Sequence, residues 1–274
     1  QVTGVQTCAL PIFLPQVAIS LYVTLDRTML GALASTKDVG IYDQALKLVN
    51  ILLTLVTSLG SVMLPRIAHL LATGDHKAVN KMHEMSFLIY NLVIFPMMAG
   101  ILIVNDDFVQ FFLGQDFQDA RYAIAIMIFR MFFIGWTNIM GIQILIPHNR
   151  NKEFMISTTA PAIISVGLNL LFLPKLGYIG AAIVSVLTEA LVWAIQLYFT
   201  RRYLKEVPII GSMTKIILAS AIMYGILLGS KTVIHFSPTL NVLVFAVLGG
   251  IIYLFAILSM KVVDVKELKQ IIKK

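Results

Sequence analysis

The chain has 274 residues, of which 58% are hydrophobic and only 13% are charged, and its mean hydropathy is +0.88. Soluble domains carry about a quarter charged residues, so this composition excludes an ordinary soluble enzyme and predicts a polytopic membrane protein. The net charge of +7 reflects basic residues between apolar stretches, which is typical of membrane topology. We therefore expect no nucleic-acid partner.

The first residues differ in origin from the rest of the chain. The stretch "VTGVQTCALPI", Val2–Ile12, back-translates into a widely used sequencing-library adapter. We expect residues 1–12 to be a translated adapter that is no part of the native fold. The single cysteine, Cys8, lies in this stretch, so it indicates nothing about redox compartment. The remaining sequence is then expected to be a C-terminal fragment of a longer protein.

Eight apolar windows follow in chain order. Each is close to the roughly 20 residues that cross a hydrocarbon core about 30 Å thick. The ten-residue alternation of a membrane β-barrel is absent, so we predict an all-α bundle of about eight transmembrane helices. Short connectors such as "STKDVG" and "PKLG" separate them. The windows cover residues 13–33, 40–66, 86–104, 122–146, 154–173, 178–199, 215–235 and 239–260.

The connectors also predict an orientation. If residue 13 starts on the cytoplasmic side, fourteen basic residues fall on that side and four on the other, which are Lys37, Arg121, Lys175 and Lys231. Positively charged loops stay in the cytoplasm. The bias therefore predicts a multi-pass protein of a cytoplasmic membrane with a cytoplasmic C-terminus. No connector is large enough for a soluble catalytic domain, so we expect no enzyme.

Besides Arg66, Lys215 and Lys231, which are counted with the connectors, six charged residues lie inside the apolar windows. A charge at the middle of a bilayer is costly, so such residues usually face a bundle interior or a wet cavity. Two interpretations remain open, internal ion pairing and a functional role. Asp43 and Lys47, four residues apart, are one candidate for a simple helical pair. The six residues are Asp26, Arg27, Asp43, Lys47, Arg130 and Glu189.

Uncharged polar residues share faces with these charges. Along window 40–66, they recur together with Asp43 and Lys47 on one face of a 3.6-residue helix over about 27 Å. Packing between helices explains most of the small polar residues but explains the cations poorly. Windows 215–235 and 239–260 lack such stripes, so we expect them at the lipid-facing periphery. The stripes include Asn50, Thr54, Thr57, Ser58 and Ser61, then Gln16, Ser20 and Thr24, then Thr137, Asn138 and Gly141, then Thr158, Ser165 and Asn169, and finally Ser185 and Gln196.

The polar faces predict a shared hydrated cavity that takes an anionic substrate, because arginine presents a planar donor fork suited to phosphate. We expect the acids to hold a coupling ion or to pair with the cations. No phosphate-binding glycine loop, metal cluster or nucleophile–base pair is present in the sequence, so we expect no catalytic residue, metal or other cofactor. The substrate-binding candidates are Arg27, Lys47, Arg130, Asn50, Asn138 and Asn169, and the coupling or ion-pair candidates are Asp26, Asp43 and Glu189.

Three stretches resemble the Wzx-type polysaccharide flippases, the polysaccharide transporter branch of the multidrug/oligosaccharidyl-lipid/polysaccharide exporter superfamily. They are "LYVTLDRTMLGALASTKDVGIYDQALKLVNI", "SVMLPRIA" and "PKLGYIGAAIVSVLTEALV". The resemblance covers residues 13–274. It implies a fold of two six-helix lobes around a central cavity with two extra helices. Residues 13–199 would form the second lobe, and residues 200–274 the extra helices and a basic cytoplasmic tail.

The resemblance also implies a function. Such flippases move undecaprenyl-diphosphate-linked oligosaccharides from the cytoplasmic to the outer leaflet of the bacterial inner membrane by alternating access. Membrane lipids, a polysaccharide polymerase and other assembly proteins would be partners. The resemblance implies that the first lobe lies outside this sequence, so we expect transport to need the longer protein.

Two alternative functions stay open. A cation-coupled multidrug exporter of the same superfamily would need acids to dominate its cavity, whereas three cations face three acids here. A polytopic glycosyltransferase or ligase would need a large hydrophilic loop. The longest connector on the outer side, residues 105–121, is instead rich in Phe and Leu.

Overall fold

The computed structural model describes residues 24–233 and 236–262, apart from the side chains of residues 55, 59, 61 and 62. Within these ranges the chain is helical and contains no strand, which confirms the predicted all-α fold. Six helical stretches in the described part are long and apolar enough to cross a membrane. The first predicted window, 13–33, is described only from residue 24, and residues 24–33 are helical.

Helices α2 (Thr36–Ala72) and α3 (His76–Phe112) are each longer than the apolar windows that predicted them. The extra turns come from polar ends that continue the helix. At the start of α2, the Ser35 hydroxyl accepts a hydrogen bond of 3.1 Å from the Asp38 amide, an N-cap that satisfies a free backbone donor. Gly74, with a φ of 76°, lies in the turn between the two helices.

The window predicted at 122–146 is one irregular span. It consists of α4 (Ala120–Met127), α5 (Arg130–Thr137) and η2 (Asn138–Leu145). Backbone bonds of the i to i+3 type at Phe129 and Met131 tighten the chain between α4 and α5. The third part, η2, is a π-helix eight residues long. π-Helical turns are rare and often occur at functional sites.

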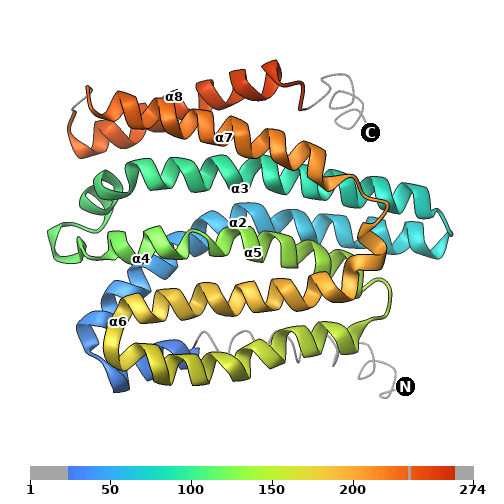
Figure 1. Cartoon of the computed structure of the whole chain (residues 1–274), viewed down its shortest axis with the longest axis horizontal. Helices are drawn as coiled ribbons and strands as arrows, with labels where there is room; N and C mark the ends of the chain where they lie inside the picture. The colour runs from blue at the N-terminus through green and yellow to red at the C-terminus, as the bar shows by residue number, and fades with distance from the viewer. Residues whose placement is uncertain (1–23, 234–235, 263–274) are drawn as a thin grey trace. The chain divides into compact units, whose positions relative to one another are not determined.

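Helix α6 (Asn151–Leu204) contains two predicted windows, 154–173 and 178–199. Gly177 has non-helical torsion angles, φ 52° and ψ −132°, and the helix folds back there so that its two arms run side by side (Figure 1). The backbone amide of Tyr178 donates to Asp38 Oδ1 at 3.2 Å. Asp38 therefore joins the start of α2 to the turn of α6.

The chain divides into two compact units. Unit 1 comprises residues 1–87 and 119–207, and unit 2 comprises residues 88–118 and 208–274. In the described part of unit 1, α2 packs against α4, α5, η2 and α6. Buried apolar side chains such as Ile41, Val49, Met127 and Val184 form its interior. Helix α3 contributes its first part to unit 1 and continues into unit 2.

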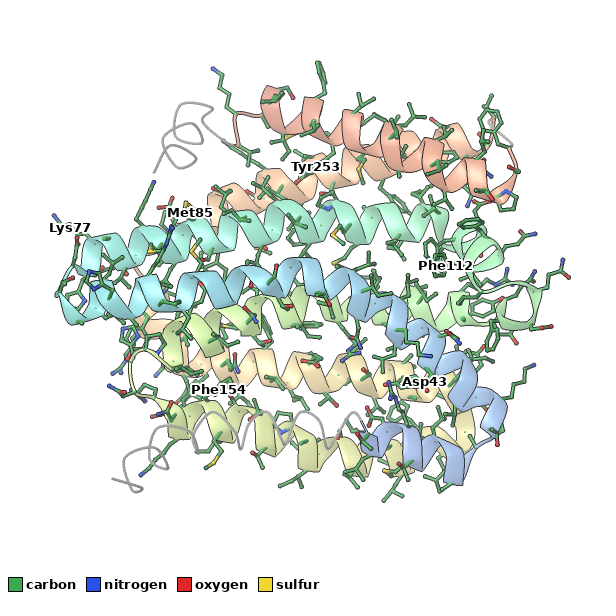
Figure 2. The ribbon with its side chains drawn as sticks, turned by 180° about the vertical axis from the view of Figure 1, so that it is seen from behind. Asp43, Lys77, Met85, Phe112, Phe154 and Tyr253 are labelled. Atoms are coloured by element: carbon green, nitrogen blue, oxygen red, sulfur yellow. The ribbon has the colours of Figure 1, made fainter. Side chains whose placement is uncertain are left out.

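Unit 2 contains the rest of α3 together with η1 (Gln115–Phe117), α7 (Ile209–Lys231) and α8 (Pro238–Ser259). Ile103, Met223, Leu227 and Phe245 belong to its apolar core. Tyr253, labelled in Figure 2, donates its hydroxyl to the Leu92 carbonyl at 2.9 Å. Unit 2 therefore groups the helix predicted at 86–104 with the two expected peripheral helices.

The outer surfaces of α7 and α8 are apolar. Leu218, Leu243 and Phe255 are 54%, 62% and 73% exposed, respectively. Large exposed apolar surfaces of this kind are unusual on soluble proteins but suit contact with lipid. This is consistent with the absence of polar stripes in windows 215–235 and 239–260.

Candidate functional site

The described residues of unit 1 line an open cavity of about 460 Å³. Its walls come from α2, α5, η2 and both arms of α6, and they combine apolar side chains with hydroxyls, amides and one pair of opposite charges. Asp43 and Phe154, labelled in Figure 2, lie toward opposite ends of these helices, and Phe154 lines the cavity. The polar residues of the wall are Asn50, Thr54, Thr57, Arg130, Thr137, Asn138, Thr158, Glu189 and Gln196.

The polar stripe of α2 supplies one wall through Asn50, Thr54 and Thr57. The hydroxyls of Thr54 and Thr57 donate to backbone carbonyls one turn earlier, at 2.9 Å and 3.0 Å. Their oxygens can still accept hydrogen bonds from a ligand. Ser58 in the same stripe is exposed, and the side chain of Ser61 lies outside the described part.

Arg130 and Glu189 carry the charges in this wall. The Arg130 Nη2 atom lies 3.3 Å from Glu189 Oε1, and the two side chains are 4% and 6% exposed. Because charges removed from water need a partner, this ion pair explains how both residues are tolerated inside a membrane span. Arg130 is the first residue of α5 and lies within the tightened stretch between α4 and α5.

Asp26 and Asn169 meet in the interior of unit 1 and do not line the cavity. The Asn169 side-chain amide donates to Asp26 Oδ1 at 2.5 Å, and the two residues are 2% and 0% exposed. Asp26 also interacts electrostatically with Arg130 and Glu189. The two coupling candidates Asp26 and Glu189 are thus parts of one buried polar region.

Asp43 pairs with Arg27 and not with Lys47. The Arg27 Nε atom lies 2.7 Å from Asp43 Oδ1, and the side chains are 39% and 29% exposed. Lys47 is exposed. The planar guanidinium of a neighbouring helix competes well for a carboxylate, which accounts for the absence of the simple helical pair. None of these three residues lines the cavity.

The structure adds polar residues to the site that the sequence placed only in stripes. Gln196 is 1% exposed and donates to the Ser157 hydroxyl at 3.2 Å, while Thr158 and Thr137 also line the cavity. Thr158, Ser165 and Asn169 share a predicted stripe, yet only Thr158 reaches the wall. Periodicity identified the right face of the helix without identifying the level of the cavity along it.

Small residues let η2 approach its neighbours closely. A Cβ atom at Gly60 would lie 2.1 Å from Asn138 Oδ1, and one at Gly141 would lie 2.6 Å from the ring of Phe154. Backbones in membrane proteins approach each other at such positions. The two glycines therefore set the width of the cavity next to Asn138.

Comparison with known proteins gives a consistent result. Residues 5–122 match the family model described as polysaccharide biosynthesis protein. An Escherichia coli protein named "Putative O-antigen transporter" is 28% identical over 69% of this chain and 46% of its own length. A Haloferax volcanii protein named as a probable low-salt glycan biosynthesis flippase is 20% identical over 85% of this chain and 49% of its own length.

The predicted resemblance to polysaccharide flippases is confirmed. An inward-closed structure of the lipid II flippase MurJ has the same fold, with a TM-score of 0.78 and 18% identity over 90% of this chain and 52% of that one. The chain spans about half the length of the curated flippases and transporters it matches. Its apolar helices and these relatives support a multi-pass membrane protein.

Proposed function

We propose that this chain is the second lobe, with the two extra helices, of a flippase for undecaprenyl-diphosphate-linked oligosaccharides. The flippase moves its substrate from the cytoplasmic to the outer leaflet by alternating access. One observation carries the proposal. A membrane-spanning unit contains a polar cavity whose wall holds a buried arginine beside several neutral amides and hydroxyls.

The neutral part of the wall suits sugars. Asn50, Asn138 and Gln196 offer amide donors and acceptors, and the threonines offer hydroxyl oxygens. Sugar hydroxyls both donate and accept hydrogen bonds, so such groups bind them without adding charge. The apolar lining residues Leu53, Ile134 and Val192 keep the cavity partly dry, which strengthens each polar contact.

The two arginines suit the diphosphate. Arg130 is paired with Glu189 and Arg27 with Asp43, so both guanidinium groups are held in place before a substrate arrives. A diphosphate oxygen forms a charge-assisted bond with the same planar fork and competes with the carboxylate for it. Arg130 lines the cavity and is proposed as the phosphate contact within it. Arg27, Lys47 and Asn169 do not line this cavity and remain substrate-binding proposals outside it.

Coupling is assigned to Asp26. Among the described residues, Asp43 and Glu189 each form an ion pair, whereas the contact partner of Asp26 is the neutral amide of Asn169. A buried carboxylate with a neutral partner gains most from a small cation or a proton. We propose that Asp26 takes up the coupling ion while Asp43 and Glu189 hold the arginines.

The cellular setting belongs to the same proposal. The proposed membrane is the bacterial inner membrane, and the loop charges favour a C-terminus in the cytoplasm. Membrane lipids surround the protein, and a polysaccharide polymerase and assembly proteins use the flipped product. Transport of this kind needs no covalent chemistry on the chain, so the protein is proposed to be a transporter and not an enzyme.

Restoration of surface polysaccharide in a flippase-deficient strain tests the proposal. The complete gene product would be expressed unchanged, as Arg130→Lys and Arg130→Ala, and as the control Arg66→Ala, which removes an exposed arginine of α2. We expect restoration by the unchanged protein and by Arg66→Ala, and a strong loss in both Arg130 variants at equal membrane levels. Full restoration by Arg130→Ala would show that this cation makes no phosphate contact.

A further inference from the structure

The π-helix η2 leaves one backbone carbonyl without its usual donor. In an α-helix, the carbonyl of Gln143 would accept from the amide of residue 147, but residue 147 is proline and has no N–H group. The next amide, that of His148, donates to the Ile144 carbonyl at 3.3 Å. A buried carbonyl in a membrane span must be satisfied from another segment.

Helix α3 supplies that donor. The His83 Nε2 atom lies 3.2 Å from the Gln143 carbonyl oxygen, and His83 is 1% exposed. Because a carbonyl oxygen can only accept, Nε2 carries the proton. Residue 143 is therefore held by a side chain that lies 60 positions away in the sequence.

A second contact fixes the side chain of the same residue. The Ser86 hydroxyl donates to Gln143 Oε1 at 2.7 Å. His83 and Ser86 are three residues apart, so they lie on one face of α3. Gln143 is 0% and Ser86 is 2% exposed. Both the main chain and the side chain of Gln143 are thus held by one helix, which defines the α3–η2 contact of His83, Ser86 and Gln143.

The held segment is a wall of the cavity. Asn138 and Ile142 of η2 line it, and Gly141 of η2 lies against Phe154 and Gln196. A π-turn carries one residue more than an α-turn, so its loss would rotate Asn138 and Ile142 relative to the rest of the wall. The position of these side chains therefore depends on what stabilises the π-helix.

We propose that His83 and Ser86 are positioning residues, which hold η2 in its π-helical form and thereby keep Asn138 and Ile142 in the cavity wall. The consequence for transport rests on the proposed flippase function, whereas the contact itself does not. Neither His83 nor Ser86 touches the cavity. They act on a substrate only through Gln143 and the segment that contains it.

Thiol labelling tests this without a substrate. Ile142→Cys would be introduced into a cysteine-free form of the complete gene product, and its reaction rate with N-ethylmaleimide measured. His83→Phe fills the space without donating to the carbonyl, whereas His83→Gln restores an N–H donor. We expect His83→Phe to lower the labelling rate about fivefold or more, since the Gln143 carbonyl loses its donor and the thiol at position 142 then rotates out of the cavity wall. In His83→Gln, the labelling rate should stay within about twofold of the rate measured with His83 unchanged.

Ser86→Ala gives an independent measurement, with Ser220→Ala in α7 as a control that makes the same change at a buried position of unit 2. We expect slower labelling only in Ser86→Ala. Equal labelling rates in Ser86→Ala and Ser220→Ala, or an equal decrease in His83→Phe and His83→Gln, would overturn the proposal. If labelling follows the expected pattern but the unchanged protein restores no polysaccharide, the flippase proposal fails and the α3–η2 contact stands.

Discussion

Arg130 and Glu189 lie on different spans, 59 residues apart in the sequence, and form an ion pair of 3.3 Å in the wall of the cavity. Both side chains are almost fully removed from the surface, at 4% and 6% exposure. Each charge therefore depends on the other for stability in a medium of low dielectric constant. The pair can be tested for structure and for transport separately.

Glu189→Gln is expected to destabilise the protein. It leaves the Arg130 charge buried beside a neutral amide, and breaking a buried pair costs about 3–5 kcal/mol. The double variant Arg130→Met, Glu189→Gln should recover part of this loss, because no charge remains. Thermal unfolding in detergent measures both. Glu84→Gln breaks the exposed pair with Lys81 and should cost less than about 1 kcal/mol; a similar cost at both positions would contradict the buried-pair argument.

Asp26→Asn separates a coupling role from a structural role. Asparagine keeps a side-chain oxygen that accepts from Asn169, so we expect thermal stability to change little. Asp26→Ala removes the acceptor and should cost about 1–3 kcal/mol. If Asp26 takes up the coupling ion, Asp26→Asn should fold normally and yet fail to restore surface polysaccharide. Normal restoration by Asp26→Asn would reduce Asp26 to a hydrogen-bond acceptor.

Gly177→Ala is expected to disturb the turn of α6. The backbone there has a positive φ of 52°, and a Cβ atom would lie 2.7 Å from Asp38 Oδ1. Such backbone strain costs about 1–3 kcal/mol. Gly167→Ala in the first arm of α6 is the matched control, because nothing lies within 4 Å of its Cβ position. A control as unstable as Gly177→Ala, again by thermal unfolding, would show that the strain argument does not apply.

Lys231→Met is expected to loosen unit 2. The Lys231 Nζ atom donates to the Ile103 carbonyl at 2.7 Å and lies 3.2 Å from Asp107 Oδ2. Asp107 also accepts from Asn241 Nδ2 at 2.9 Å, so the ends of α3, α7 and α8 share one polar cluster. Amide hydrogen exchange in α7 and α8 should increase.

The matched control for this cluster is Ser230→Ala, because that hydroxyl donates only within its own helix, to the Ile226 carbonyl. Its exchange should remain close to that of the unchanged protein. Exchange that rises equally across α2 and α6 in Lys231→Met would indicate general unfolding and would contradict a cluster that acts within unit 2.

The apolar windows predicted the helical spans. Lipid offers no hydrogen-bond partners, so the backbone of such a window must satisfy its own N–H and C=O groups, and a helix does this within one segment. Windows 40–66 and 86–104 correspond to α2 and α3, and the breaker "PKLG" contains the turn at Gly177. The stripe of Asn50, Thr54 and Thr57 does face the cavity. Residue periodicity fixes a helix face, since each helical residue advances by a constant angle.

Only the tertiary structure decided which side chains meet. The sequence offered Asp43 a candidate partner in its own helix, Lys47, yet Asp43 pairs with Arg27. Asn169 was expected to contact the substrate, but its side-chain amide donates to Asp26. The contact of His83 with Gln143 had one indication in the sequence, namely Pro147, which removes a donor but does not name its replacement. Such pairings join residues as many as 143 positions apart. They depend on how whole helices pack, which the pattern within one helix does not specify.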